Sequence, residues 1–131
     1  MKISFANALD LHPQAIALRA RRTEVLASNL ANADTPHYKA RDFDVDRLLR
    51  EAGAPAVPLR VTHVNHIVPV SDPLSEERLR YRVPQQASLD GNTVEEHIEQ
   101  AKFAENALRY QASLNFINGK ISGLMLALRG E

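Results

Sequence analysis

Several residue types that build reactive or ligand-binding sites are missing from this 131-residue chain or rare in it. It has no cysteine, which excludes disulfides and thiolate metal sites. Tryptophan is also absent, and only 5% of the residues are aromatic. The five glycines form neither a phosphate-binding loop nor a dinucleotide-binding fingerprint. We therefore expect no cofactor.

The chain also lacks an excess of either charge and has no long apolar runs. The 16 basic and 16 acidic residues cancel, so no net field attracts nucleic acid or an anionic membrane. No segment approaches the ~20 consecutive apolar residues that cross a bilayer. Residues 1–7 contain neither the apolar run nor the cleavage site of a secretion signal. These absences predict no nucleic-acid partner, no direct membrane insertion and no cleaved signal peptide.

Reactive side-chain clusters are also not apparent. No serine lies in a nucleophile elbow with an adjoining histidine and acid, so we expect no catalytic residues and no enzyme activity. His63 and His66 come closest to a metal-binding pair. Three residues apart on a strand, their side chains would point to opposite faces, which is unsuitable for shared chelation. We interpret them as surface residues and expect no metal.

Charged residues cluster in two places. Asp42, Asp44 and Asp46 alternate and could bind a divalent cation, but no glycine-containing calcium loop follows them. A solvated face or ion pairs with arginine are the favoured interpretations. Arginines crowd positions 19–22 and alternate at 78–82, and we expect them to form ion pairs between subunits.

The prolines divide the chain into three parts. One lies at position 13 and the other six lie between positions 36 and 84, where they prevent a long helix. We therefore predict an N-terminal helix within 1–35, an insert with short strands and turns at 36–90, and a C-terminal helix within 91–131. The expected fold is mainly α, with two long terminal helices in an antiparallel, coiled-coil-like pair and a small, irregular β-containing insert.

The N-terminal helix is predicted to span about residues 13–33, because proline is tolerated in a first turn. Its apolar residues fall on two sides. One side has a 4-3-4-3 spacing, and the other has a spacing of seven. The first side contains Ile16, Ala20, Thr23, Ala27 and Leu30, and the second contains Leu11, Leu18 and Val25.

The C-terminal helix has a stronger pattern. Asn92 is predicted to cap it, and Glu95 would complete a capping box. An unbroken 4-3 repeat then predicts a left-handed coiled-coil seam, and a second stripe lies on the opposite side. The seam contains Phe103, Ala107, Tyr110, Leu114, Ile117, Ile121, Leu124 and Leu128, and the second stripe contains Ala101, Leu108, Ala112, Phe116, Gly119, Gly123 and Leu126.

A helix that is apolar on opposite faces must be covered twice. The N-terminal helix can supply one cover, and the short chain offers no obvious second one. We expect neighbouring subunits to supply it, with Ala112, Gly119 and Gly123 allowing close backbone approach. The alternative is a helix buried inside a single globule.

The insert shows two strand-like runs. Residues 60–68 alternate well enough for a strand, and residues 79–83 alternate cleanly. A turn signal at 71–73 separates them, so a short hairpin or small sheet is expected. The segment 42–51 could form a helical turn.

The N-terminal helix ends in an unusual sequence motif. Asn29 and Asn32 disfavour helix interiors, because their amides compete for backbone hydrogen bonds. A Thr-Pro stop and a tyrosine follow, and we expect this motif to close the helix and hold the turn after it. The motif consists of Asn29, Leu30, Ala31, Asn32, Thr35, Pro36, Tyr38 and Lys39.

The motif resembles the Asn-Leu-Ala-Asn-x-x-Thr-Pro-x-Tyr-Lys signature of bacterial flagellar axial proteins. The continuation Ala-Arg-Asp-Phe at 40–43 is most similar to that of proximal rod proteins. A second motif at 90–111 combines Asp-Gly-Asn-x-Val with Asn-x-Leu-x-Tyr-Gln and resembles the C-terminal pattern of the same family. One position departs: His37 stands where many rod proteins have glycine, and a left-handed backbone would be awkward there for histidine.

The resemblance implies a structural subunit of the proximal rod of the flagellar basal body, a torque-transmitting shaft in the periplasmic space. The implied partners are copies of the chain, the rod protein FlgC, FliE and the MS-ring region. It also implies export by the flagellar type III apparatus without a cleaved signal peptide. The alternatives are a cytoplasmic helical adaptor or export chaperone and the related subunit FlgC, which the sequence at 38–42 disfavours.

Overall fold

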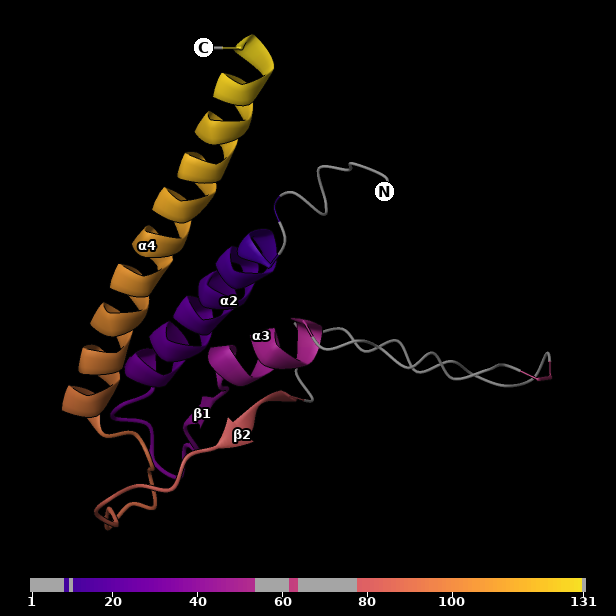
Figure 1. Cartoon of the computed structure of the whole chain (residues 1–131). Helices are drawn as coiled ribbons and strands as arrows, with labels where there is room; N and C mark the ends of the chain where they lie inside the picture. The colour runs from indigo at the N-terminus through magenta and orange to yellow at the C-terminus, as the bar shows by residue number, and fades with distance from the viewer. Residues whose placement is uncertain (1–8, 10, 54–61, 64–77, 131) are drawn as a thin grey trace.

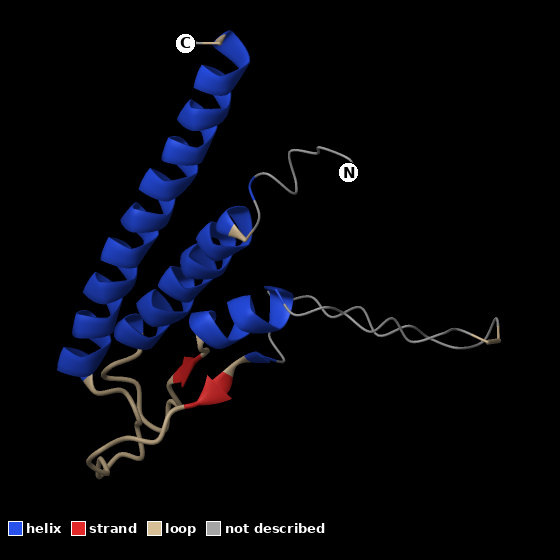
Figure 2. Cartoon of the chain, viewed as in Figure 1, coloured by secondary structure: helices blue, strands red, loops and turns tan. Residues whose placement is uncertain are grey.

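The computed structural model describes residues 9, 11–53, 62–63 and 78–130. In chain order its elements are helix α2, strand β1, helix α3, strand β2 and helix α4, as Figure 1 and Figure 2 show. Their bounds are α2 His12–Ala31, β1 Arg41–Asp42, α3 Val45–Gly53, β2 Arg80–Tyr81 and α4 Glu96–Arg129. The predicted fold, mainly α with two long helices and a small β-containing insert, is confirmed.

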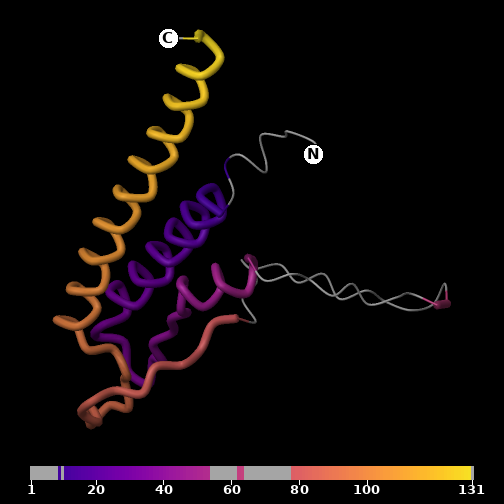
Figure 3. The backbone as a smooth tube through the Cα atoms, viewed as in Figure 1, coloured from indigo at the N-terminus to yellow at the C-terminus, as the bar shows by residue number. Residues whose placement is uncertain are grey.

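The two long helices run antiparallel (Figure 3). The Asn106 side chain of α4 donates hydrogen bonds to the Arg19 carbonyl and the Thr23 hydroxyl of α2, both at 2.9 Å. Further along α4, the ring of Phe116 stacks on His12 at the start of α2, with 6.3 Å between the ring centroids. The 34 residues of α4 exceed the 20 of α2, and at 1.5 Å per residue α4 is about 20 Å longer. The C-terminal turns of α4 therefore extend past the beginning of α2 (Figure 1).

Helix α2 lies between α4 and α3 (Figure 1). Its Leu18 and Val25 are buried in one apolar cluster with Phe43, which directly follows β1, and with Val45 and Leu48 of α3. Thr23, on another side of α2, contacts α4 instead. Both sides of the N-terminal helix are therefore covered within the chain, one by α4 and the other by α3 from the insert.

The small sheet pairs strands that the sequence analysis did not pair. Strands β1 and β2 are antiparallel, with Arg41 opposite Tyr81 and Asp42 opposite Arg80. The strand predicted at 79–83 is present only at Arg80–Tyr81. Its partner is the segment after the Thr-Pro turn, where no strand was predicted. The other predicted strand lies largely outside the described residues.

The predicted cap of the C-terminal helix is wrong. Glu95 occupies the N-cap position of α4 with no side-chain capping bond, and α4 begins at Glu96. The Asn92 side chain is instead directed at the end of α2, as described below. At the other end α4 stops at Gly130, whose left-handed backbone (φ 75°) lets its N–H reach the Leu126 carbonyl.

The face of α4 that is buried most deeply is polar. Glu99, Asn106 and Ser113, seven residues apart, are its buried side chains. The predicted seam lies beside this line, and its members are partly buried or exposed. The second stripe is exposed throughout the described chain. None of the helices described here is long and apolar enough to cross a membrane.

Candidate functional site

The two sequence motifs, about 60 residues apart, lie side by side in the structure. The Thr93 N–H donates to the Tyr38 carbonyl at 3.0 Å. The Thr93 hydroxyl accepts from the Ala40 N–H at 2.8 Å. Lys39 adds a bond from its Nζ to the Gly91 carbonyl at 2.6 Å. The sequence analysis identified both motifs but did not predict this contact.

Asn92 closes the C-terminal end of α2. Its Nδ2 lies 3.1, 2.6 and 3.0 Å from the carbonyl oxygens of Asn32, Ala33 and Thr35. Its Oδ1 accepts from the Val94 N–H at 2.8 Å. Carbonyls at a helix end have no partner within the helix, so a buried amide there replaces the hydrogen bonds that water would supply.

The second asparagine of the N-terminal motif, Asn32, shapes the turn locally. Its Nδ2 donates to the Ser28 carbonyl at 2.8 Å, and its Oδ1 accepts from the Thr35 hydroxyl at 3.1 Å. These bonds agree with the expectation that Asn32 closes the helix and holds the turn, whereas Asn29 has a different role. Of the other motif members, Leu30 is partly buried, whereas Ala31 and Pro36 are exposed.

The first asparagine, Asn29, is fully buried and connects three segments. Its Nδ2 donates to the Arg41 carbonyl at 2.8 Å and to Glu99 Oε2 at 3.1 Å. Its Oδ1 accepts from the Arg41 N–H at 3.2 Å and from the Tyr38 hydroxyl at 3.4 Å. One side chain thus joins α2 to β1 and α4.

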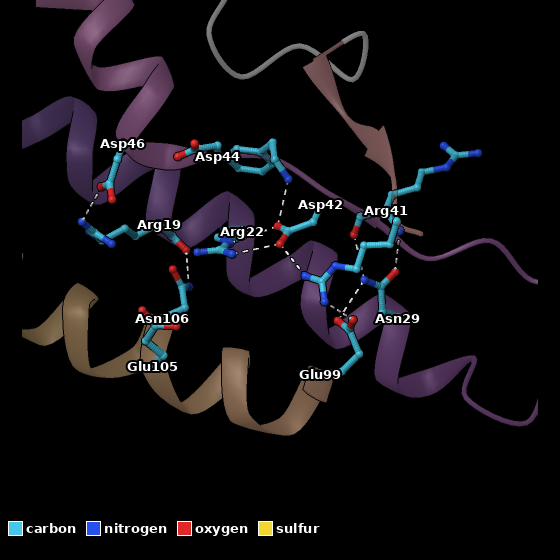
Figure 4. A network of polar contacts seen from close by, with 12 residues as sticks. Arg19, Arg22, Asn29, Arg41, Asp42, Asp44, Asp46, Glu99, Glu105 and Asn106 are labelled. Atoms are coloured by element: carbon cyan, nitrogen blue, oxygen red, sulfur yellow. Dashed lines mark hydrogen bonds and ion pairs between the residues drawn. The ribbon is translucent and has the colours of Figure 1, made fainter. Parts of the chain in front are cut away.

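A chain of ion pairs continues from Asn29 (Figure 4). Glu99 Oε1 accepts from Arg82 at 2.5 Å, and Arg82 also pairs with Asp42. Arg22 grips the same Asp42 with two hydrogen bonds of 3.0 and 2.9 Å. We call Asn29, Arg22, Asp42, Arg82 and Glu99 the junction network. Its two cations balance its two anions, and it joins α2, β1, the end of β2 and α4.

The junction network shifts the pKa values of Asp42 and Arg22. Burial raises the pKa of Asp42, but the Arg22 hydrogen bonds, helped by the Phe43 N–H and Arg82, outweigh burial and hold this pKa below its usual value. The hydrogen bond to Asp42 in turn raises the pKa of Arg22. Beside the network, burial and then the charge of Arg82 lower the pKa of Lys102. Asp42 and Arg22 are therefore both charged near neutral pH.

The alternating carboxylates serve three different purposes. Asp42 belongs to the junction network. Asp44 accepts from the Arg47 N–H at 3.1 Å at the start of α3, as an N-terminal cap does. Asp46 pairs with Arg19 at 3.7 Å and Arg109 at 3.2 Å. The interpretation as arginine partners is correct for two of them, but these pairs form within the chain. The expectation that the arginines at 19–22 and 78–82 pair between subunits is therefore wrong for those that form ion pairs inside the chain. These are Arg19, Arg21, Arg22, Arg78 and Arg82.

His37 adopts the backbone that the family pattern assigns to glycine. Its φ is 62°, the one positive value at a non-glycine residue in the described chain. The His37 N–H donates to the Asp90 carbonyl at 3.1 Å, which ties this turn to the second motif. Gly91 opposite has a φ of 73°, and a Cβ there would lie 3.0 Å from the His37 ring, so a side chain at Gly91 would be strained and tightly packed. The turn therefore keeps its left-handed form despite the histidine.

The sequence singles out every residue of the junction network except Glu99, but it does not predict that they bind one another. Asp42 lies in the Ala-Arg-Asp-Phe continuation that the resemblance covers. The seven-residue spacing of Glu99, Asn106 and Ser113 is a sequence signal for the inner face of α4 that the search for apolar stripes did not use. Arg22 and Arg82 gave no signal beyond their charge. The polar groups of the junction network bind one another, and they hold α2, β1, β2 and α4 in fixed relative positions.

Comparison with known proteins agrees with the motifs. A sequence profile described as "Flagella basal body rod protein" matches residues 9–39. The flagellar basal body rod protein FlgB of Cereibacter sphaeroides is 49% identical, over 97% of this chain and 98% of that protein. The FlgB proteins of Aeromonas hydrophila and Escherichia coli K12 are 45% and 43% identical, over 100% and 93% of this chain and 99% and 93% of theirs. The chain belongs to the FlgB family of flagellar basal body rod proteins.

Proposed function

We propose that this chain is a non-catalytic subunit of the proximal rod that polymerises through its terminal helices into the torque-transmitting shaft. The observation that carries the proposal is the uncovered apolar surface of α4. Leu108, Phe116 and Leu128 are 74%, 65% and 83% exposed. Apolar patches of this kind mark association surfaces in soluble proteins.

Both stripes of α4 belong to the proposed assembly surface. Seam residues Leu114, Ile117 and Leu124 are partly buried. At Gly119 and Gly123 an added Cβ would meet no atom within 4 Å, so the backbone of a neighbouring helix could approach closely. The proposed packing residues are Phe103, Ala107, Tyr110, Leu114, Ile117, Ile121, Leu124, Leu128, Leu108, Ala112, Phe116, Gly119 and Gly123.

The proposal assigns a role to each part of the chain. Segments 1–35 and 91–131 would form the helical layer of the rod, and 36–90 would form the outer insert. The junction network would fix the angle between the two. We propose copies of the chain, FlgC, FliE and the MS-ring region as neighbours, and type III export without a cleaved signal peptide to the periplasmic space.

Two substitutions on α4 test this proposal. Leu108→Ser and Leu126→Ser change exposed side chains, so the free energy of unfolding of the purified chain should change by no more than about 0.5 kcal/mol. In cells lacking the native protein, both variants should fail to enter the rod and to restore swimming. Asn118→Ser, at an exposed polar position of the same helix, is the matched control.

The outcome separates the rod subunit from the alternative helical adaptor or export chaperone. Normal rod incorporation of both leucine variants would contradict the proposal. A stable, soluble homodimer that buries Leu108 and Leu126 in the purified chain would favour the alternative.

A further inference from the structure

An open cleft of about 600 Å³ lies where α2 faces β1 and β2. Its lining combines apolar, aromatic and basic side chains. Val25 and Leu79 contribute apolar surface, and Tyr81, which is 67% exposed, lies at its edge. The proposed assembly surface on α4 does not line this cleft. We call it the β-ribbon cleft.

The cations of the β-ribbon cleft are used differently from those of the junction network. Arg22 and Arg82 bind carboxylates of the chain. In the described structure Arg41 has no carboxylate partner, and its guanidinium lies over the Tyr81 ring, 5.2 Å from the centroid. Lys39 binds only a carbonyl oxygen there, that of Gly91. Two cations thus line one cleft without a bound anion.

The charge balance of the cleft is positive. Arg21, Lys39 and Arg41 line it with one acid, Glu24, which pairs with Arg21 at 2.6 Å. An arginine stacked on an aromatic ring loses little further freedom when it binds, and its planar fork matches a carboxylate. The nearby Val25, Leu79 and Tyr81 would contact an aliphatic side chain.

We propose that the β-ribbon cleft docks an acidic segment of a neighbouring protein that alternates carboxylate and aliphatic side chains. Arg41 binds a carboxylate of that segment, Lys39 attracts a second, and Leu79 and Tyr81 contact its apolar residues. A nucleic acid or lipid surface fits less well. The chain has no net charge to attract either, and each presents a repeated phosphate pattern, whereas this cleft is small and partly apolar.

Nuclear magnetic resonance of the full-length, ¹⁵N-labelled chain tests the proposal. The probe is the capped peptide Glu-Leu-Glu-Leu-Glu, with Lys-Leu-Lys-Leu-Lys as the charge-reversed control. We expect the acidic peptide to shift the amide signals of Lys39, Arg41 and Tyr81 and to leave those of the C-terminal turns of α4 unchanged. The basic peptide should cause no shift.

Variants locate the binding. Arg41→Gln should weaken acidic-peptide binding about tenfold or more, as expected for loss of one charge-assisted pair. Lys39→Gln should weaken it less. Arg50→Gln, which removes an exposed cation of α3 outside the cleft, is the matched control and should bind as the parent does. Circular dichroism checks that each variant is folded.

Two results would overturn the proposal: equal binding of the acidic peptide by the parent and Arg41→Gln, or Arg41-dependent binding of phosphatidylglycerol vesicles without peptide binding. The experiment is independent of the proposed rod function. Peptide binding is measured on the isolated chain, whereas the α4 variants report rod incorporation, so either can fail alone.

Discussion

Asn29 shows how one short side chain can decide the relative positions of several segments. Its amide satisfies both the N–H and the carbonyl of Arg41 and also donates to Glu99. An alanine at this position would leave these buried groups without partners. We expect Asn29→Ala to lower the free energy of unfolding by about 2–3 kcal/mol, measured by urea denaturation.

Asn29→Asp keeps the shape of the side chain but changes its charge, so it tests the role of the amide donor more directly. It removes the donor and places a carboxylate beside Glu99, so we expect a loss at least as large as that of the alanine variant. Adding Glu99→Gln should recover part of it, because the repulsion is then gone. Asn118→Asp, on the exposed side of α4, is the control. An Asn29→Asp variant as stable as the parent would contradict this role.

His37 carries local strain. A left-handed backbone destabilises a non-glycine residue by roughly 1–2 kcal/mol. Glycine avoids this strain, but it lowers the stability of the fold by about 0.5–1 kcal/mol because its unfolded chain has more conformational entropy. We therefore expect His37→Gly to leave stability unchanged or raise it by up to about 1 kcal/mol. His37→Val, which is β-branched, should be destabilising. Thermal unfolding of both variants gives the comparison, and a marked loss in His37→Gly would show that the imidazole matters more than the backbone.

The depressed pKa of Asp42 predicts a dependence of stability on pH. The unfolded carboxyl has a pKa of about 3.9 and binds a proton at a higher pH than the folded one. The Asp42 contribution is therefore complete above the unfolded pKa and is lost as the pH falls through the folded value. Urea denaturation should show that Asp42→Asn is much less stable than the parent at pH 7 and that the difference shrinks below pH 4. A constant difference would contradict this.

At the scale of elements, Asn92 fixes the end of α2 from a segment 60 residues away. We expect Asn92→Ala to cost about 1–3 kcal/mol, because three carbonyls at a helix end lose their donor. The Val94 amide, which donates to Asn92 Oδ1, should also exchange its hydrogen faster. Asn118→Ala is the control, and unchanged Val94 exchange would rule out the interaction.

The elements differ in how well the sequence predicts them. Both long helices follow from apolar spacing and proline placement, which are local signals, and α2 was placed within about two residues. Strand β1 and the partner of β2 could not be predicted, because two-residue strands carry almost no periodicity. The role of Asn92 was misassigned, because a capping residue can serve a distant helix as well as the adjacent one. The junction network depends on residues from four segments that only the folded chain brings together.

At the scale of the whole molecule, α4 has several large apolar side chains that are exposed, whereas α2 has none among the described residues. Leu26 of α2 is 0% exposed, whereas Ile121 is 41% exposed. Leu26→Ala should therefore cost about 2–5 kcal/mol in the isolated chain. Ile121→Ala should cost less than about 1 kcal/mol there and still impair rod incorporation. Equal losses in the isolated chain would show that Ile121 is covered without a neighbour.

The greater length of α4 has a mechanical consequence. From Glu99 to Arg129 the helix extends about 45 Å, and Asn106 lies only about 10 Å from Glu99 along it. If α4 pivots at its root, 1 Å of play at Asn106 becomes about 4 Å of swing at the tip. The hydrogen bonds of Glu99 with Arg82 and Asn29 limit such a movement at the root, and those of Asn106 with Arg19 and Thr23 limit it one step further along. The position of the tip is therefore determined by contacts along the part of α4 that faces α2, from Glu99 to Phe116.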